Sequence, residues 1–292
     1  MRAAALTMVH TELDYLGLWL RHYEQQFGRE NLYVVAHGSD PAVVALAKGC
    51  NIVPLPRHRV SGSFDKDRFA FLNAYADFLL TQYDGVVAGD VDEIVFVDPA
   101  LGLSLPEYMA QNRHQGAALK AFCLNIVEEQ GAAPLDLTRP ILGQRRHARA
   151  NELFSKPLVV FDRPGWSVGF HSTPHPPCLP DGLFVAHLHY ASRRICQDIA
   201  LSRSTTLAEN PDIRRGHDHT TQWWAERLRK FDAYVEKAAS FATAPLDQVI
   251  DGYRETLRAT VIDSQWLRHK TFGFPSRPKM RLELPERFAQ AF

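Results

Sequence analysis

Short apolar runs alternate with helical patterns along the first hundred residues. Residues 3–9, 31–36 and 52–55 are rich in apolar and β-branched side chains, as strands are. Between such runs, over 11–28 and 65–82, apolar residues recur every three or four positions, as on one face of an amphipathic helix. This alternation predicts an α/β fold with an open, mostly parallel, Rossmann-like sheet and helices on both faces, whose ligands gather at the carboxyl ends of the strands.

Helix ends are marked by residues with known capping preferences. Thr11 precedes the first helical pattern and is predicted to cap it, and Gly28 follows its last apolar position. Asp40 and Pro41 form an N-cap and a first helical residue, and Gly49 is expected to close that short helix. These positions predict the bounds of the first two helices.

The pattern changes after about residue 100. Strands are expected over 117–125, 157–161 and 183–190, with a loop rich in Gly, Pro and Arg between the first two. The chain then becomes helical. We therefore expect an α/β part over 1–200 and a helical extension over 201–292.

An apolar run leads directly into acidic residues at 86–94. Asp90 and Asp92 follow three apolar residues and a glycine, and Glu93 comes next. Alternate residues of a strand point to the same side, so the two aspartates can converge while Val91 turns into the core. Burying acids here is costly unless a cation compensates them. Hard oxygen ligands suit Mg²⁺ or Mn²⁺ that carries a substrate phosphate, so the pattern predicts a metal site.

Composition narrows the functional classes. The 33 basic and 33 acidic residues balance, so no overall charge favours nucleic acid or an anionic membrane. The four cysteines form no C-x-x-C pair, and no apolar stretch reaches the length of a membrane span, which favours a cytoplasmic protein. The basic and aromatic segment 267–292 is expected to pack on its own domain; peripheral contact with the inner face of a membrane is the alternative.

Several motifs together resemble those of GT-A glycosyltransferases, in particular the family 2-like and family 92-like group. They occur in this order: His10-Thr11-Glu12, Trp19, His22-Tyr23, Gly38-Ser39-Asp40, Arg68, Gly89-Asp90-Val91-Asp92-Glu93-Ile94, Lys156, Gly169-Phe170-His171 and His187-Leu188-His189-Tyr190. The resemblance covers about 3–194. It implies a nucleoside-diphosphate sugar as donor, foremost a UDP-sugar, a divalent metal held by the D-x-D motif, and transfer to a glycan or another hydroxyl acceptor, with inversion expected.

Candidate metal ligands come from two segments. Asp90 and Asp92 are the first pair. His187 and His189 are alternate residues of the strand expected over 183–190 and can face the same way, and the resemblance favours His189 as a third ligand. Either histidine could instead be hydrogen-bonded at a strand end without binding metal.

The remaining candidates divide by role. The nucleotide is expected at the ends of the first two strands, near Thr7, His10, Glu12, Ser39 and Asp40. Asp40 could equally be a plain N-cap, and Glu12 a first-turn acid of the helix.

Phosphate contacts are expected from Arg68 and Lys156. The catalytic candidates are Asp92 and His171, which could donate to the diphosphate or position the acceptor. The base that takes the acceptor proton could be Glu128, Glu129, Glu152 or Asp181; spacing singles out none of them, and Glu128 is chosen because the segment after the fifth strand is expected at the acceptor side.

Two other functions remain open. A nucleotidyltransferase acting on a sugar phosphate uses similar sheets and aspartate-held Mg²⁺, although it usually carries a Gly-rich phosphate loop near the N-terminus, and Arg2-Ala3-Ala4-Ala5 supplies none. The other alternative is a carbohydrate-binding scaffold without catalysis, against which Asp90, Asp92 and His189 argue.

Overall fold

The computed structural model describes residues 1–292 except 58–62, 210–225, 266, 268 and 274–279. Its first sheet has six strands, in the order β3 (Asn51–Leu55), β2 (Leu32–His37), β1 (Ala3–Val9), β4 (Gly85–Ala88), β9 (Val159–Val160) and β6 (Ala118–Leu119). The first four are parallel, and β9 runs antiparallel to both of its neighbours. The parallel half is the predicted Rossmann-like unit.

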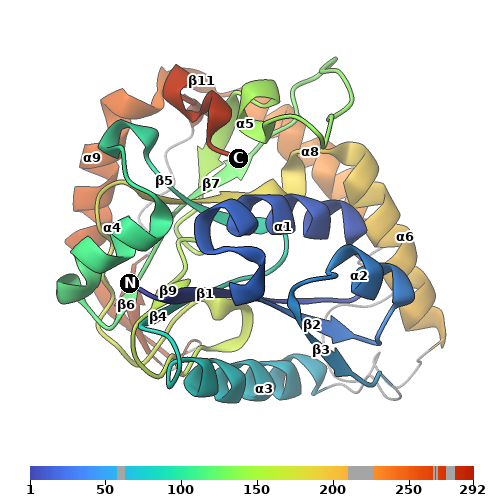
Figure 1. Ribbon diagram of the computed structural model, residues 1–292. Coiled ribbons are helices and arrows are strands. Elements are labelled where there is room, and N and C mark those ends of the chain that lie inside the picture. Colours follow the sequence, from blue (N-terminus) through green and yellow to red (C-terminus); the bar gives the residue numbers. More distant parts are fainter. Residues whose placement is uncertain (58–62, 210–225, 266, 268, 274–279) are drawn as a thin grey trace.

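Helices cover both faces of this sheet. α1 (Leu13–Phe27) and α2 (Pro41–Leu46) lie on one side, and α3 (Phe64–Leu79) lies on the other (Figure 1). Every residue of β1 is buried, which explains why this strand is a continuous apolar run without alternation. The Trp19 and Tyr23 side chains of α1 are buried in the same core.

A second six-stranded sheet completes the α/β architecture. Its order is β11 (Ala242–Pro245), β14 (Met280–Glu283), β8 (His147–Ala150), β7 (Phe122–Ile126), β10 (Leu183–His187) and β5 (Glu93–Val97). A separate hairpin joins β12 (Val261–Ser264) to β13 (His269–Phe272). Among the described residues, the other α-helices are α4 (Leu105–Asn112), α5 (Ile141–Gln144), α6 (Arg193–Glu209), α8 (Arg227–Ala239) and α9 (Leu246–Arg258). The 3₁₀ turns are η1 (Arg29–Asn31), η2 (Pro99–Leu101), η3 (Arg113–Gln115), η4 (Val168–Phe170), η5 (Leu188–Tyr190) and η7 (Glu286–Gln290).

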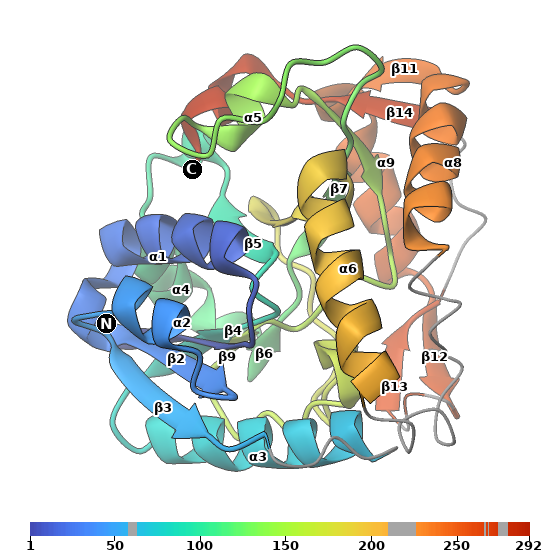
Figure 2. The same cartoon turned by 90° about the vertical axis from the view of Figure 1, so that its right-hand side faces the viewer.

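Residues beyond 200 are more than a helical extension. The expected boundary between 200 and 201 falls inside α6, and β14 pairs with β8 in the second sheet. Figure 2 shows α6 and α8 side by side, with β14 and β11 at the top of the molecule. The later part of the chain therefore supplies strands to the sheet as well as helices. None of the described helices is long and apolar enough to cross a membrane.

The early elements follow the sequence prediction, with shifts at their ends. β1 has the predicted bounds, Gly28 ends α1, and the Asp40 carboxylate accepts a hydrogen bond of 2.8 Å from the backbone N–H of Ala42, as an N-cap does. Thr11 is not the cap of α1, because Glu12 occupies that position. α2 ends before Gly49.

The later strands differ more. The strand expected over 117–125 is two strands in different sheets, β6 and β7. The strand expected over 183–190 ends at His187, and His189 lies in the turn η5.

Candidate functional site

The acidic residues lie in the turn that joins the two sheets. β4 belongs to the first sheet and β5 to the second, and residues 89–92 connect them. The backbone N–H of Glu93 donates to the Asp90 carbonyl at 2.9 Å, and the N–H of Leu188 donates to the Asp92 carbonyl, also at 2.9 Å. The buried Thr7 hydroxyl donates to the Gly89 carbonyl at 3.0 Å. Thr7 thus supports this turn from β1, and its nucleotide-binding role stays a prediction.

Two cations hold the Asp90 side chain. The Arg68 guanidinium donates to Oδ1, and the Lys156 ammonium lies 3.5 Å from Oδ2. Burial alone would raise the pKa of Asp90, but Arg68 and Lys156 hold it well below its usual range. Arg68 and Lys156 both contact Asp90, and the phosphate contacts expected of them stay predictions.

Lys156 also forms a buried ion pair with Glu93. Each side chain is only 2% exposed, and the ammonium donates to Glu93 Oε1. Burial raises the pKa of Glu93 to about 7, while Lys156 acts in the opposite direction. A lysine enclosed in this way is held by two carboxylates, so its charge has a fixed position.

Asp92 faces the histidines of the second sheet. His187 Nε2 lies 3.5 Å and His189 Nδ1 lies 4.0 Å from Asp92 Oδ2. The Glu93–His187 pair of β5 and β10 brings the end of β10 to the acidic turn. Burial opposes ionisation of Asp92, but the neighbouring His187 ring lowers its pKa to about 2. The predicted convergence of Asp92 with His187 is therefore seen in the structure.

The hydrogen bonds around His187 indicate a place for a cation. His187 Nδ1 lies 2.9 Å from Asn125 Oδ1, and since an amide oxygen can only accept, Nδ1 carries the hydrogen. When the ring is neutral, Nε2 directs a lone pair at the Asp92 carboxylate and two acceptors face one another; when the ring is protonated, Nε2–H pairs with Asp92 instead. A divalent cation between them would remove this repulsion, and the Asn125 contact is the kind of outer hydrogen bond that orients a metal-binding histidine.

The full predicted ligand set does not converge. Within the described part of the chain there is no group of three or more His, Cys, Asp or Glu side chains that could hold a metal ion. Asp90 is turned to Arg68 and Lys156. Asp92 and His187 fit a divalent ion that takes its other ligands from phosphate and water, which is how Mg²⁺ is commonly bound.

His189 is held differently from His187. Arg227 donates to His189 Nδ1 at 3.1 Å, so the lone pair of that nitrogen is in use. Its buried Nε2 has no hydrogen-bond partner among the described residues. Burial and Arg227 lower the pKa of His189 well below its usual value. His187 lies closer to Asp92 than His189 does, and the metal-binding role expected for His189 stays a prediction.

His171 lies on the Lys156 side of the site. Its Nδ1 donates to the Leu153 carbonyl at 2.8 Å. Burial and the Lys156 charge lower the pKa of His171 to about 3, so the ring is neutral at pH 7. A ring this weakly basic suits positioning better than proton abstraction.

The predicted nucleotide residues cluster at the ends of β1 and β2. His10 Nδ1 donates to the His37 carbonyl at 2.8 Å, and the His37 ring stacks on Phe64 with centroids 5.2 Å apart. Arg57 donates to His37 Nδ1 at 3.1 Å. Burial and Arg57 lower the pKa of His37 to about 4. This group of His10, His37, Arg57 and Phe64 presents neutral aromatic rings beside a cation.

Three other nucleotide candidates have local structural roles. The Glu12 carboxylate accepts from the backbone N–H groups of His10 and Thr11, each at 3.1 Å, and pairs with Arg203. Asp40 caps α2, and Ser39 adopts a φ of 54° in the turn before it. Their binding roles stay predictions.

Glu128, the predicted base, lies at the start of α6. Its carboxylate accepts a hydrogen bond of 2.6 Å from the backbone N–H of Arg193. This is a helix-capping contact. The contact does not bring Glu128 to Asp90 or Asp92, and its catalytic role remains a prediction.

The sequence interpretation missed several residues that the structure places at the site. Glu93 was noted only as a third acid, and Asn125, Arg227 and His37 were not considered. Asn125 carried a signal, since it is a polar residue inside the apolar strand β7 and is only 2% exposed. Buried amides of this kind need hydrogen-bond partners and often orient other side chains.

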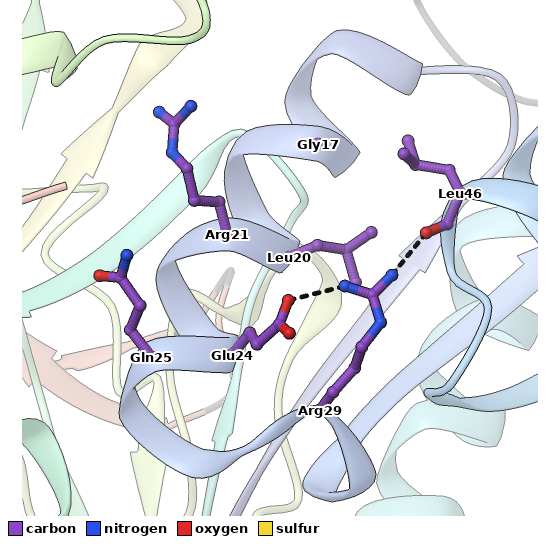
Figure 3. A pocket seen from close by; sticks show the side chains of 7 residues that line it. All are labelled: Gly17, Leu20, Arg21, Glu24, Gln25, Arg29 and Leu46. Carbon is purple, nitrogen blue, oxygen red and sulfur yellow. Dashed lines mark hydrogen bonds and ion pairs between the residues drawn. The ribbon is translucent and has the colours of Figure 1, made fainter.

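A separate pocket of about 360 Å³ lies between α1 and α2 (Figure 3). Its lining residues are Gly17, Leu20, Arg21, Glu24, Gln25, Arg29 and Leu46. The Arg29 guanidinium bridges the pocket by donating to Glu24 and to the Leu46 carbonyl, each at 2.7 Å (Figure 3). None of the predicted site residues lines it, so it is distinct from the acidic turn.

Comparisons with known proteins show similarity to solved structures only. No family model and no curated protein matches the chain. A mannose-1-phosphate geranyltransferase from Thermus thermophilus is 12% identical, with 97% of this chain and 74% of that one covered and a TM-score of 0.31. A cytidylyltransferase from Leptospira borgpetersenii serovar Hardjo-bovis is 14% identical over 43% and 54% of the two chains, with a TM-score of 0.26. A 4-diphosphocytidyl-2C-methyl-D-erythritol synthase is 12% identical over 55% and 74%, with a TM-score of 0.31. Similarity this low does not decide function, and the α/β fold stands on its own strand order.

Proposed function

We propose that this protein is a transferase that moves a sugar from a nucleoside-diphosphate sugar to a hydroxyl acceptor, with Mn²⁺ or Mg²⁺ held at Asp92 and His187. The main support is the close approach of His187 Nε2 and Asp92 Oδ2, which lie 3.5 Å apart beside the turn between the two sheets and could both ligate one cation when the ring is neutral. Arg68 and Lys156 lie on the adjacent acid, Asp90. A cation site with fixed positive charges beside it suits a diphosphate.

Each part of the site has a role in this proposal. The divalent cation, when bound, would act as a Lewis acid on the diphosphate leaving group. Lys156 and Arg68 would supply further positive charge to the same group, while Glu93 keeps Lys156 in place. His37 and Phe64 would form an aromatic wall for the nucleoside. Neutral His171 would orient the acceptor or a phosphate oxygen by a hydrogen bond.

A nucleotidyltransferase that acts on a sugar phosphate is the second candidate. The chemistry of Asp92 and His187 would serve it as well, because a divalent cation also neutralises the phosphates of a nucleoside triphosphate. The triphosphate is its natural ligand, which distinguishes the two candidates. A glycan acceptor and contact with a membrane surface also remain predictions.

Ligand-dependent thermal stability tests the proposal. UDP, GDP, CMP, UTP and CTP are added with and without Mn²⁺, and the melting temperature is recorded. We expect stabilisation by a nucleoside diphosphate only with Mn²⁺, on the order of 2.7 kcal/mol at a hundred times the dissociation constant. Preference for a triphosphate would support the second candidate, and no stabilisation by any ligand would leave the scaffold alternative.

Matched variants locate the effect. Asp92→Ala and Asp92→Asn should abolish the Mn²⁺-dependent shift and turnover of a UDP-sugar, with little loss of folding. Asp84→Asn, the same change at an acid before β4, is the control and should behave as wild type. Full turnover by Asp92→Ala would refute the assignment.

A further inference from the structure

A line of hydrogen bonds runs from the acidic turn to α8. Asp92 faces His187, His187 Nδ1 contacts Asn125 Oδ1 at 2.9 Å, and Asn125 Nδ2 donates to the Tyr234 hydroxyl at 3.0 Å. Asp92 precedes β5, His187 ends β10, Asn125 belongs to β7, and Tyr234 belongs to α8. The later part of the chain therefore reaches the proposed metal site through side chains.

The two ends of the Asn125 amide are fixed by different partners. Its oxygen lies near two donors, His187 Nδ1–H and the Cys123 thiol, whose Sγ is 3.6 Å away. Burial raises the pKa of Cys123 well above its usual value, so it stays a thiol that can donate. Its nitrogen donates to Tyr234, and burial raises the pKa of that phenol to about 12, so the phenol is neutral.

Packing fixes the position of the Tyr234 hydroxyl. The Tyr234 ring stacks on the Tyr190 ring, with centroids 3.8 Å apart and planes 10° from parallel. Arg149 lies over the Tyr234 ring, 4.9 Å from its centroid. The side chain is therefore held at its ring as well as at its hydroxyl.

We propose that Asn125 and Tyr234 are positioning residues that keep the hydrogen of the neutral His187 ring on Nδ1, so that Nε2 faces Asp92 and is open to a metal ion. With the amide reversed, its NH₂ group would donate to Nδ1, Nε2 would carry the hydrogen, and that hydrogen would occupy the space of a metal ion. Tyr234 accepts from Nδ2 and holds the amide in place, while the Nδ1–H contact gives its oxygen the position facing His187. The consequence of this proposal, that α8 tunes the affinity of the site for the metal, rests on the proposed function.

The tautomer itself can be measured without metal or substrate. In ¹⁵N-labelled protein, the His187 ring signals are assigned by their loss in His187→Gln, and the nitrogen shifts show which nitrogen carries the hydrogen. At a pH at which the nitrogen shifts show a neutral ring, we expect Nδ1–H in the wild type and a mixture or Nε2–H in Asn125→Leu. An Nε2–H wild type, or an unchanged tautomer in Asn125→Leu, would overturn the proposal. This result does not depend on whether the protein is a glycosyltransferase.

Metal affinity supplies the second measurement. Free Mn²⁺ is followed by its EPR signal while it is titrated into the full chain with saturating UDP. We expect Asn125→Leu to weaken binding about 10- to 100-fold. Tyr234→Phe, which keeps the stacked ring, should weaken it about three- to tenfold. Asn125→Asp keeps an oxygen for Nδ1–H and should retain the wild-type tautomer.

A remote phenol serves as the matched control. The Tyr33 hydroxyl contacts that of Tyr83 at 3.0 Å in the first sheet, so Tyr33→Phe makes the same deletion elsewhere and should leave Mn²⁺ affinity unchanged. If Asn125→Leu does not fold, Tyr234→Phe carries the test, and wild-type Mn²⁺ affinity in that variant would refute the role of α8. Absence of Mn²⁺ binding in the wild type would refute the proposed function, while the tautomer measurement would still decide the role of Asn125.

Discussion

Removal of the Lys156 charge is the most demanding test of how the acidic turn is stabilised. Lys156→Met keeps most of the side-chain volume and leaves Glu93, which is 2% exposed, without its counter-charge. Asp90 keeps Arg68 as a partner. Removing one member of a buried ion pair costs about 3–5 kcal/mol, because an uncompensated charge remains in a site of low polarity. We expect that loss in the free energy of unfolding at pH 8.

The loss should depend on pH, with a defined sign. Burial has already raised the pKa of Glu93 to about 7, above its ordinary value of 4.5 in the unfolded chain. Between these values the folded state binds more protons, so the contribution of Glu93 to stability falls as pH rises. Without Lys156 the folded pKa rises further, and the fall continues above pH 7. Between pH 6 and 8 the wild type loses about 1.4 kcal/mol through Glu93 and the variant up to about 2.7 kcal/mol, at about 1.36 kcal/mol per unit. The cost of the substitution should therefore be smaller at pH 6 than at pH 8, by up to about 1.4 kcal/mol.

Urea unfolding followed by tryptophan fluorescence at both pH values measures these quantities. The double variant Glu93→Gln, Lys156→Met removes both charges and should recover most of the stability. In the recovered protein, affinity for UDP with Mn²⁺ should still be about tenfold lower, which corresponds to about 1.4 kcal/mol. Wild-type stability of Lys156→Met at pH 8, or a larger loss at pH 6, would refute the argument.

Three further predictions concern single side chains. Burial lowers the pKa of Lys120 to about 7, whereas the lysine of the unfolded chain keeps its proton up to about pH 10. Between pH 7 and 9 the free energy of unfolding of the wild type should therefore rise by about 1.4 kcal/mol per pH unit relative to Lys120→Met in urea unfolding. The same dependence of stability on pH in both proteins would contradict this. Arg287 donates to both Asp98 oxygens, at 2.7 and 2.9 Å, and Arg287→Ala should cost about 1–2 kcal/mol in thermal unfolding, whereas no change would show that the contact is negligible. Asp40→Ala should cost about 1 kcal/mol in thermal unfolding as a lost N-cap, and unchanged stability would contradict the cap; UDP affinity of the same variant, measured by calorimetry, decides whether Asp40 also binds the nucleotide.

The first hundred residues could be predicted closely because their signals are local. Apolar runs, helical spacing and the Gly28 and Asp40 positions determine β1, α1 and α2 through short-range preferences. The acidic turn was predicted for the same reason, since an apolar strand that ends in carboxylates is visible within about ten residues. Its placement between two sheets was not predicted, because this depends on the pairing of β5 with β10 far along the chain.

The partners of the acids could not be predicted from spacing. Arg68 and Lys156 were expected to contact phosphate, and nothing local shows that both first contact Asp90. His187 and His189 were expected to alternate on one strand, but the strand ends at His187, and Arg227 from α8 engages His189. Contacts between distant segments decide which lone pairs and charges remain for a ligand.

The charges of the turn explain why a cation matters to this proposal. The turn carries three acids, Asp90, Asp92 and Glu93. Among the residues that the structure describes, the lysine and arginine side chains that form ion pairs with these acids are Arg68 and Lys156, so the acids outnumber those cations. A diphosphate brought to this turn alone would face a site without excess positive charge. A divalent ion between Asp92 and His187 would reverse the balance at the position where the phosphates have to lie. Affinity for UDP should thus depend on the metal far more than affinity for an uncharged nucleoside, which would contact only the rings at the ends of β1 and β2.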